Sequence, residues 1–210
     1  MDLVRKTVAG LLDEVALKFP EKEALVDLSQ GVRYSYKELL AMVNQTAKGF
    51  LKLGLKEGDH LALWSPNRWE WTMTQLALAK IGVVLISVDT SCKVEQLEYL
   101  LRQSDSRSLV MAEGMKGSEY IDMIHQLCPE VKEAIPGRFS CRALPELRNI
   151  ILISGRTLGG MFHWKEILDM GKDIPDRMLA ERQGSCREDH MVTILYTCLL
   201  YTSPSPRDCS

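Results

Sequence analysis

The chain has 210 residues, of which 46% are hydrophobic and 26% charged, and 26 Lys and Arg against 28 Asp and Glu give a formal net charge of −2. This composition excludes a disordered chain, a collagen-like repeat and a disulfide-stapled miniprotein. No apolar run approaches the roughly 20 residues of a membrane-spanning helix, and the near-zero charge gives no reason to expect nucleic acid or an anionic membrane as a partner.

The first quarter of the chain predicts two helices and a hairpin. Apolar residues recur at helical spacing over Val8–Phe19. Two β-prone runs, 24–26 and 32–36, flank a Gly-containing turn and indicate a β-hairpin. A longer amphipathic helix is expected over 36–53, with Gly54 as its stop.

From residue 58 onward, short apolar strands alternate with helices. The predicted strands are 60–64, 83–88, 108–112, 149–154 and 191–196. The predicted helices are 69–81, 94–103, 119–127, 163–170 and 175–182. Residues 130–147 are polar and are expected to form a long surface excursion. This alternation predicts an α/β fold with a doubly wound parallel sheet and right-handed crossovers.

The sequence holds no known phosphate-binding or nucleophile motif. G-x-x-x-x-G-K-[ST], G-x-G-x-x-G after a strand and G-x-S-x-G are all missing. Gly54–Asp59 joins a helix to a strand and is interpreted as a structural turn. The segment Ser65–Asn67 follows a strand, where open α/β sheets bind ligands, but Asn67 is expected to cap the next helix. No catalytic residue is assigned on these grounds.

The remaining candidates favour structural roles. Trp64, Trp69 and Trp71 are expected in the core. Glu95 and Glu98, beside Lys93 and Arg102, indicate a solvated helix face. Six cysteines are scattered without a C-x-x-C pair, so reduced thiols are expected and no metal ligand is assigned: Cys92, Cys128, Cys141, Cys186, Cys198 and Cys209.

Four segments, in the same order along the chain, resemble the AMP-forming acyl-CoA synthetases of the adenylate-forming ligase superfamily: Arg33–Leu39, Gly54–Trp71, Leu76–Gly82 and Glu95–Leu101. The first matches the family pattern R-[YF]-[TS]-[YF]-x-E-L. The second matches G-x-x-x-G-D-x-[VL]-A-[IL]-x-x-P-N-x-x-E-[WF]. The stretch from His125 to Val131 resembles the medium-chain members more narrowly. The resemblance covers residues 7–197. One departure is Val88–Cys92, where the family usually has Asn-Pro-x-[YF]; loss of the proline predicts a looser loop.

The resemblance implies an N-terminal domain of a fatty acid–CoA ligase that uses ATP, magnesium and CoA. In that family a T-S-G-T-T-G loop after the last predicted strand holds the ATP phosphates. Thr197 would be its first residue and the only cofactor-binding residue present. Residues 7–197 are therefore expected to be an incomplete AMP-dependent ligase domain. Close relatives are mitochondrial, but Met1–Lys6 shows no presequence, so two readings stay open: a cytoplasmic location, or a missing upstream segment.

After Thr197 the sequence departs from the family. Cys198–Asp208 resembles a translated transposase-type sequencing adaptor, so 198–210 is expected to be a non-native, disordered tail; a genuine alternative C-terminus is the other reading. The 210-residue chain is expected to be inactive and to leave sheet edges uncovered. The alternatives are a non-catalytic interaction module with a Rossmann-like fold, and another nucleotide-dependent enzyme, which would need an early Gly-rich loop.

Overall fold

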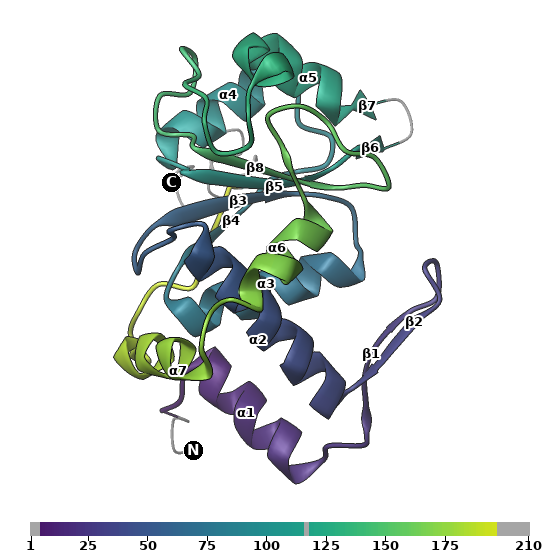
Figure 1. Cartoon of the computed structure of the whole chain (residues 1–210), viewed down its shortest axis with the longest axis vertical. Helices are drawn as coiled ribbons and strands as arrows, with labels where there is room; N and C mark the ends of the chain where they lie inside the picture. The colour runs from purple at the N-terminus through teal and green to yellow at the C-terminus, as the bar shows by residue number, and fades with distance from the viewer. Residues whose placement is uncertain (1–4, 116–117, 197–210) are drawn as a thin grey trace, which may run out of the picture.

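A six-stranded parallel sheet forms the centre of the computed structural model, which describes residues 5–115 and 118–196 (Figure 1). Within the described residues its order is β10-β4-β3-β5-β8-β9. The bounds are β3 His60–Trp64, β4 Val84–Ser87, β5 Ser108–Ala112, β8 Asn149–Ile153, β9 Phe162–His163 and β10 Thr193–Leu195. Every pairing in this sheet is parallel. The predicted sheet is confirmed, and β9 is a strand that the sequence pattern did not indicate.

The central strands are buried on both faces because nearly all their side chains are apolar. On β3, Ala62 and Trp64 pack into one core cluster, whereas Leu61 and Leu63 pack into the other. The same alternation runs through β8 and through Leu109–Met111 of β5, and all residues of both strands are buried. Strands apolar on both sides need a helical layer on each face.

Helices supply both layers, as a doubly wound fold requires (Figure 1). One side carries α1 Val8–Lys18, α2 Tyr36–Lys52, α3 Trp69–Ile81, α6 Trp164–Gly171 and α7 Asp176–Ser185. The other side carries α4 Val94–Gln103 and α5 Tyr120–Leu127. Side-chain capping hydrogen bonds mark the first residues of α1 and α2. The Thr7 hydroxyl accepts from the backbone N–H of Gly10, and Ser35 and Glu38 form a capping box.

Two small antiparallel sheets lie outside the central one. β1 Glu23–Asp27 pairs with β2 Val32–Ser35, which confirms the predicted hairpin, and the pair projects from the helical layer in Figure 1. β6 Gly114–Met115 pairs with β7 Ser118–Glu119 just before α5.

The turn between α2 and β3 has the structural role expected of it. Gly54 and Gly58 adopt φ values of +85° and +81°, which favour glycine. The Asp59 carboxylate accepts a hydrogen bond from the backbone N–H of Lys56 at 2.8 Å. These features close the turn internally.

The expectation of a surface excursion over 130–147 holds for most of the segment, whose residues are largely exposed, but four of its residues are buried. The segment begins in a 3-10 turn, η1 Pro129–Glu133, and it contributes Val131, Cys141, Leu144 and Leu147 to the core cluster shared with α4 and α5. The buried residues fall at irregular intervals along the segment, so no regular period marks the buried side.

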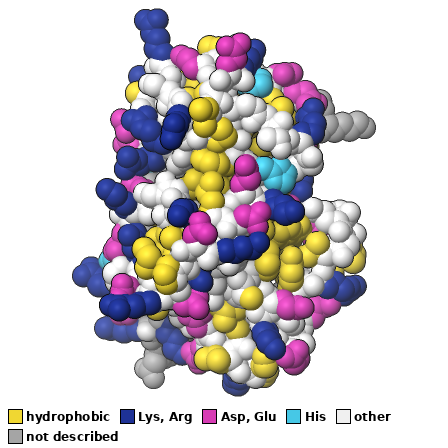
Figure 2. All heavy atoms as spheres, in the orientation of Figure 1, with side chains coloured by type: hydrophobic (Ala, Val, Ile, Leu, Met, Phe, Trp, Pro, Cys, Tyr) yellow, Lys and Arg dark blue, Asp and Glu magenta, His cyan; other side chains and the backbone are white. Residues whose placement is uncertain are grey.

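The surface agrees with the balanced composition. Figure 2 shows Lys and Arg interspersed with Asp and Glu over the face in view, with hydrophobic side chains gathered near its centre. Among residues 5–115 and 118–196, no helix is long and apolar enough to cross a membrane.

Candidate functional site

The carboxyl edge of the parallel sheet is the candidate site. β3 and β4 are neighbours, yet β3 leads into α3 on one face and β4 leads into α4 on the other. Their loops therefore diverge at the carboxyl ends of the strands, the edge at which open α/β sheets bind ligands. The loops after β5 and β8 begin at the same edge of the sheet, because β3, β4, β5 and β8 are all parallel.

Two aromatic side chains fix the loop after β4. The Trp64 indole stacks on the Tyr120 ring with centroids 3.7 Å apart. Trp64 Nε1 donates to the backbone oxygen of Asp89 at 3.1 Å, and Tyr120 Oη donates to that of Thr90 at 2.9 Å. The core role predicted for Trp64 is confirmed, and the stack positions a loop at the candidate site.

The same loop closes on itself through Asp89. Its carboxylate accepts from the backbone N–H and the hydroxyl of Ser91, both at 2.7 Å. These hydrogen bonds lower the pKa of Asp89. These hydrogen bonds hold the loop without the proline, and its greater looseness relative to the family's loop stays a prediction.

The loops after β5 and β8 are joined by a charged cluster. Ser154 Oγ donates to the Glu113 carboxylate, and Arg156 Nη2 lies 2.6 Å from Glu113 Oε2. The hydrogen bond from Ser154, followed by that from Arg156, lowers the pKa of Glu113. Since this carboxylate and that of Asp89 are both engaged, we assign neither to magnesium.

The cap prediction for Asn67 is wrong. The N-cap of α3 is Arg68, which makes no side-chain capping bond. Instead, the backbone N–H of Trp69 donates to the Asp27 carboxylate of the hairpin at 3.2 Å. Asn67 is exposed beside this contact. A cap contributed from 42 positions away leaves no local pattern in the sequence.

Asp27 is the centre of that contact. Its carboxylate also accepts from Ser29 and Gln30, and these bonds, with Ser29 first, lower its pKa from 3.8 to about 2. Negative charge beside the first turn of a helix is favourable because unpaired N–H groups point toward it. An Asp followed by Ser two positions later is the only local signal of this turn.

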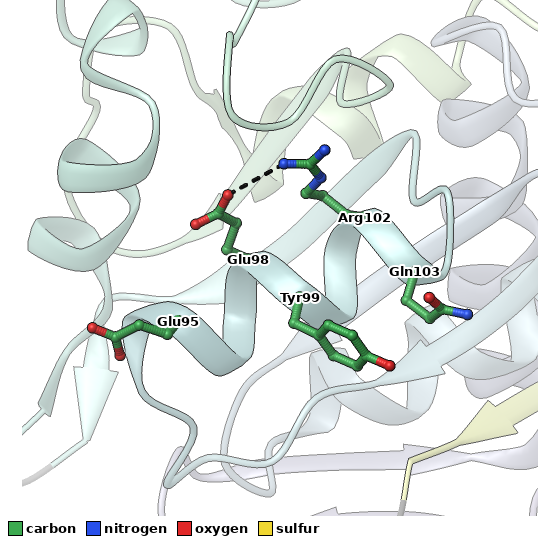
Figure 3. Close-up of a pocket in the computed structure, with 5 residues that line it drawn as sticks. All are labelled: Glu95, Glu98, Tyr99, Arg102 and Gln103. Atoms are coloured by element: carbon green, nitrogen blue, oxygen red, sulfur yellow. Dashed lines mark ion pairs between the residues drawn. The ribbon is translucent and has the colours of Figure 1, made fainter.

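The open pocket on α4 confirms the predicted solvated face. It has a volume of about 490 Å³ and is lined by Glu95, Glu98, Tyr99, Arg102 and Gln103. Figure 3 shows that all five side chains come from one helix, with Glu98 and Arg102 paired at 3.5 Å. Because no second element lines it, the pocket offers no convergent polar groups for a ligand.

The expected phosphate-loop residue, Thr197, and the tail 198–210 lie outside the described residues. The strand that precedes them is described: β10 pairs in parallel with β4 and ends at the same sheet edge. β10 is shorter than predicted, and its burial is partial.

The sequence model of the family described as "AMP-binding enzyme" matches residues 12–198. The chain belongs to this family. The resemblance drawn from the four motif segments is therefore confirmed, and the AMP-binding enzyme domain covers most of the chain.

Two relatives illustrate the likeness. The putative acyl-CoA synthetase YngI of Bacillus subtilis is 36% identical over 196 residues, which cover 93% of this chain and 36% of that protein. The mitochondrial medium-chain acyl-CoA ligase ACSF2 of Rattus norvegicus is 34% identical over 182 residues, 87% of this chain and 30% of that protein. The chain thus spans about a third of the length of these relatives, and the narrower resemblance at 125–131 agrees with the ACSF2 match.

Solved structures confirm the fold. A long-chain-fatty-acid-CoA ligase from Archaeoglobus fulgidus superposes with a TM-score of 0.68 at 16% identity, over 94% of this chain and 36% of that one. The N-terminal domain of FACL13 from Mycobacterium tuberculosis gives 0.63 at 21% identity, over 92% of this chain and 41% of that one. At such identities the likeness concerns the fold alone.

Proposed function

We propose that this AMP-binding enzyme domain is the N-terminal part of a fatty acid–CoA ligase. The supporting observations are the likeness to named acyl-CoA synthetases and ligases and the parallel β10, which ends at the edge where the loops after β3, β4, β5 and β8 begin. In the proposed reaction a fatty acid carboxylate attacks the α-phosphate of ATP, giving acyl-adenylate and pyrophosphate. The CoA thiol then attacks the adenylate carbonyl, giving acyl-CoA and AMP.

Within this proposal, the described residues build the floor of the site and hold no reactant. Trp64 and Tyr120 fix the loop after β4, and Glu113 joins the loops after β5 and β8. Contact with the ATP phosphates is proposed for the loop beginning at Thr197. Magnesium would offset phosphate charge in such a reaction, and no described residue at this edge is assigned to it.

We further propose that the 210-residue chain tested by itself does not form acyl-adenylate. Its residues after Thr197 read Cys-Leu-Leu rather than Ser-Gly-Thr. ATP–pyrophosphate exchange with medium- and long-chain fatty acids should stay at background, with rat ACSF2 as the positive control. Fatty-acid-dependent exchange by the 210-residue chain would overturn this part of the proposal.

A chimera tests the function itself. Residues 5–196 replace the equivalent segment of rat ACSF2, so that the rest of the ligase follows β10 directly. We expect fatty-acid-dependent exchange to be restored, because the domain supplies the same sheet edge. A folded chimera without exchange, judged by circular dichroism and cooperative melting, would contradict the proposed function.

We also propose that residues 198–210 do not belong to the native fold, and the family match ending at residue 198 supports this. Amplification of the transcript beyond the codon for Thr197 is the direct test. A product that continues into Cys-Leu-Leu-Tyr-Thr would refute the adaptor origin. For location, the ACSF2 relatives support a mitochondrial protein, and microscopy of the complete tagged gene product would test it.

A further inference from the structure

Two buried thiols and a carboxylate converge where α5 ends. The Sγ atoms of Cys128 and Cys141 and a carboxylate oxygen of Glu130 all lie within 4.8 Å of one another. Cys128 and Cys141 have exposed fractions of 0% and 1%, whereas Glu130 is exposed. The group lies in no pocket or loop used by the proposed ligase site.

The junction of α5 with η1 positions Cys128 and Glu130, and the irregular segment after η1 positions Cys141. Cys128 is the C-cap of α5, and its backbone N–H donates to the oxygen of Ile124 at 2.8 Å. Glu130 belongs to η1. Cys141 lies in the irregular segment that follows, and its Sγ contacts the backbone oxygen of Leu127 at 3.5 Å. The sequence spacing hides the group, because the two cysteines are distant along the chain and no C-x-x-C pair exists.

The three donor atoms lie close enough together to share one cation, and both thiols are buried. A cation that replaces the thiol protons removes the cost of burying negative charge. Of the three donor residues, Glu130 is the exposed one.

We propose that Cys128, Glu130 and Cys141 bind one Zn²⁺ ion, with water as the fourth ligand. Two thiols and a carboxylate match the ligand preference of zinc. Zn–S bonds of about 2.3 Å and Zn–O bonds of about 2.0–2.2 Å place tetrahedral ligands about 3.5–3.8 Å apart, so the group, whose atoms lie within 4.8 Å of one another, needs a contraction of at most about 1.3 Å. Glu130 can supply most of this movement because its side chain is exposed.

The ion would act structurally. α5 begins near the carboxyl edge, where Tyr120 contacts Thr90, and it ends at the zinc group one helix length away. The ion would clip Cys141 and its irregular segment to the end of α5. The ion would bind the folded chain more tightly than the unfolded chain. The fold would therefore be stabilised by the difference between these two binding free energies.

The test uses the whole 210-residue chain, fully reduced with a phosphine and freed of metal. We expect one Zn²⁺ per chain by native mass spectrometry and release of two protons in weak buffer. Co²⁺ should give the near-ultraviolet absorption of cobalt–thiolate bonds together with tetrahedral visible bands. Zn²⁺ should raise the melting temperature of the chain.

Matched variants assign the ligands. Cys128→Ala and Cys141→Ala should each weaken Zn²⁺ binding at least tenfold, whereas Cys92→Ala, at another buried thiol, should not. Because core variants can fail to fold, Glu130→Gln provides a surface test against its neighbour Glu133→Gln, and only the former should weaken binding. Absence of cobalt–thiolate absorption in the folded, reduced chain, or equal effects of the two glutamate variants, would overturn the proposal.

Discussion

At the residue scale, Gly49 shows how a close backbone contact constrains the sequence. A Cβ at this position of α2 would lie 2.1 Å from the backbone oxygen of Ile167 in α6. Neither atom belongs to a flexible side-chain tip, so the helices would have to separate. The α2–α6 packing therefore requires glycine despite its poor helix propensity.

Gly49→Ala should lower the free energy of unfolding by about 1–3 kcal/mol, the cost of forcing an extra methyl group into a packed interface. The matched control is Gly184→Ala in α7, where a Cβ meets nothing within 4 Å. There the better helix propensity of alanine should stabilise the chain by about 0.5–1 kcal/mol. Denaturant unfolding of both variants measures the difference, and a neutral Gly49→Ala would contradict the close packing.

Asp27 provides a second prediction at this scale, for pH. Its pKa is about 2 in the folded chain, below its ordinary 3.8. The folded chain thus favours the ionised form of Asp27 more than the unfolded chain does. This carboxylate therefore stabilises the fold above about pH 3.8, and the stabilisation is lost as the pH falls through about 2. NMR titration of its carboxyl carbon should show the low pKa.

Ser29→Ala should raise that pKa toward its ordinary value, because Ser29 donates the leading hydrogen bond. Asp27→Asn should destabilise the chain at pH 7 and much less near pH 2. A stability difference between Asp27→Asn and the parent that does not change with pH would show that the carboxylate charge is unimportant.

At the element scale, a buried ion pair joins three helices. Lys80 of α3 is 1% exposed, and its Nζ lies 2.6 Å from Asp13 Oδ1 of α1 and 3.0 Å from Gln183 Oε1 of α7. Gln183 also donates to Asp13. Every partner of the ammonium group therefore comes from another helix.

Asp13→Asn should cost about 2–3 kcal/mol, less than the 3–5 of a fully enclosed pair, because Asp13 is one-third exposed. Lys80→Met should cost less than Asp13→Asn, since it removes the buried charge rather than leaving it unpaired. Hydrogen exchange should report loosening of α1 and α7 in Asp13→Asn first. Equal costs for the two variants would contradict a desolvated ammonium group.

The elements also show what sequence alone could predict. Apolar runs of strand length predicted β3, β4, β5 and β8, because burial on both faces leaves an uninterrupted signal. Apolar spacing likewise predicted α1 and α2, whose starts also carry local caps in the structure. The failures share a cause: the α3 cap from Asp27 and the four buried residues of segment 130–147 depend on partners distant in sequence.

The same division applies to the candidate site. The loops after β3 and β4 could be expected at the carboxyl edge from the α/β alternation. The Trp64–Tyr120 stack and the Glu113–Arg156 pair could not, because each joins residues from different crossover units. Family resemblance supplied the reaction, which the individual residues did not indicate.

At the scale of the whole molecule, β10 is an edge strand of the central sheet. Among the described residues it pairs with β4 alone, and Leu195 is 66% exposed. A flat strand edge with an exposed apolar side chain is a template for pairing with another chain. We therefore expect the 210-residue chain to self-associate through β10.

Leu195→Lys should reduce this association, because a charge on an edge strand opposes pairing with a second copy. The control is Leu17→Lys on α1, where the leucine is 82% exposed but lies on a helix whose backbone hydrogen bonds are internal. Sedimentation velocity over a concentration series should show a larger monomer fraction for Leu195→Lys than for Leu17→Lys. The two substitutions add the same charge and differ in whether a strand edge or a helix carries it. Equal gains in the monomer fraction would therefore show that the association depends on general surface hydrophobicity and not on the β10 edge.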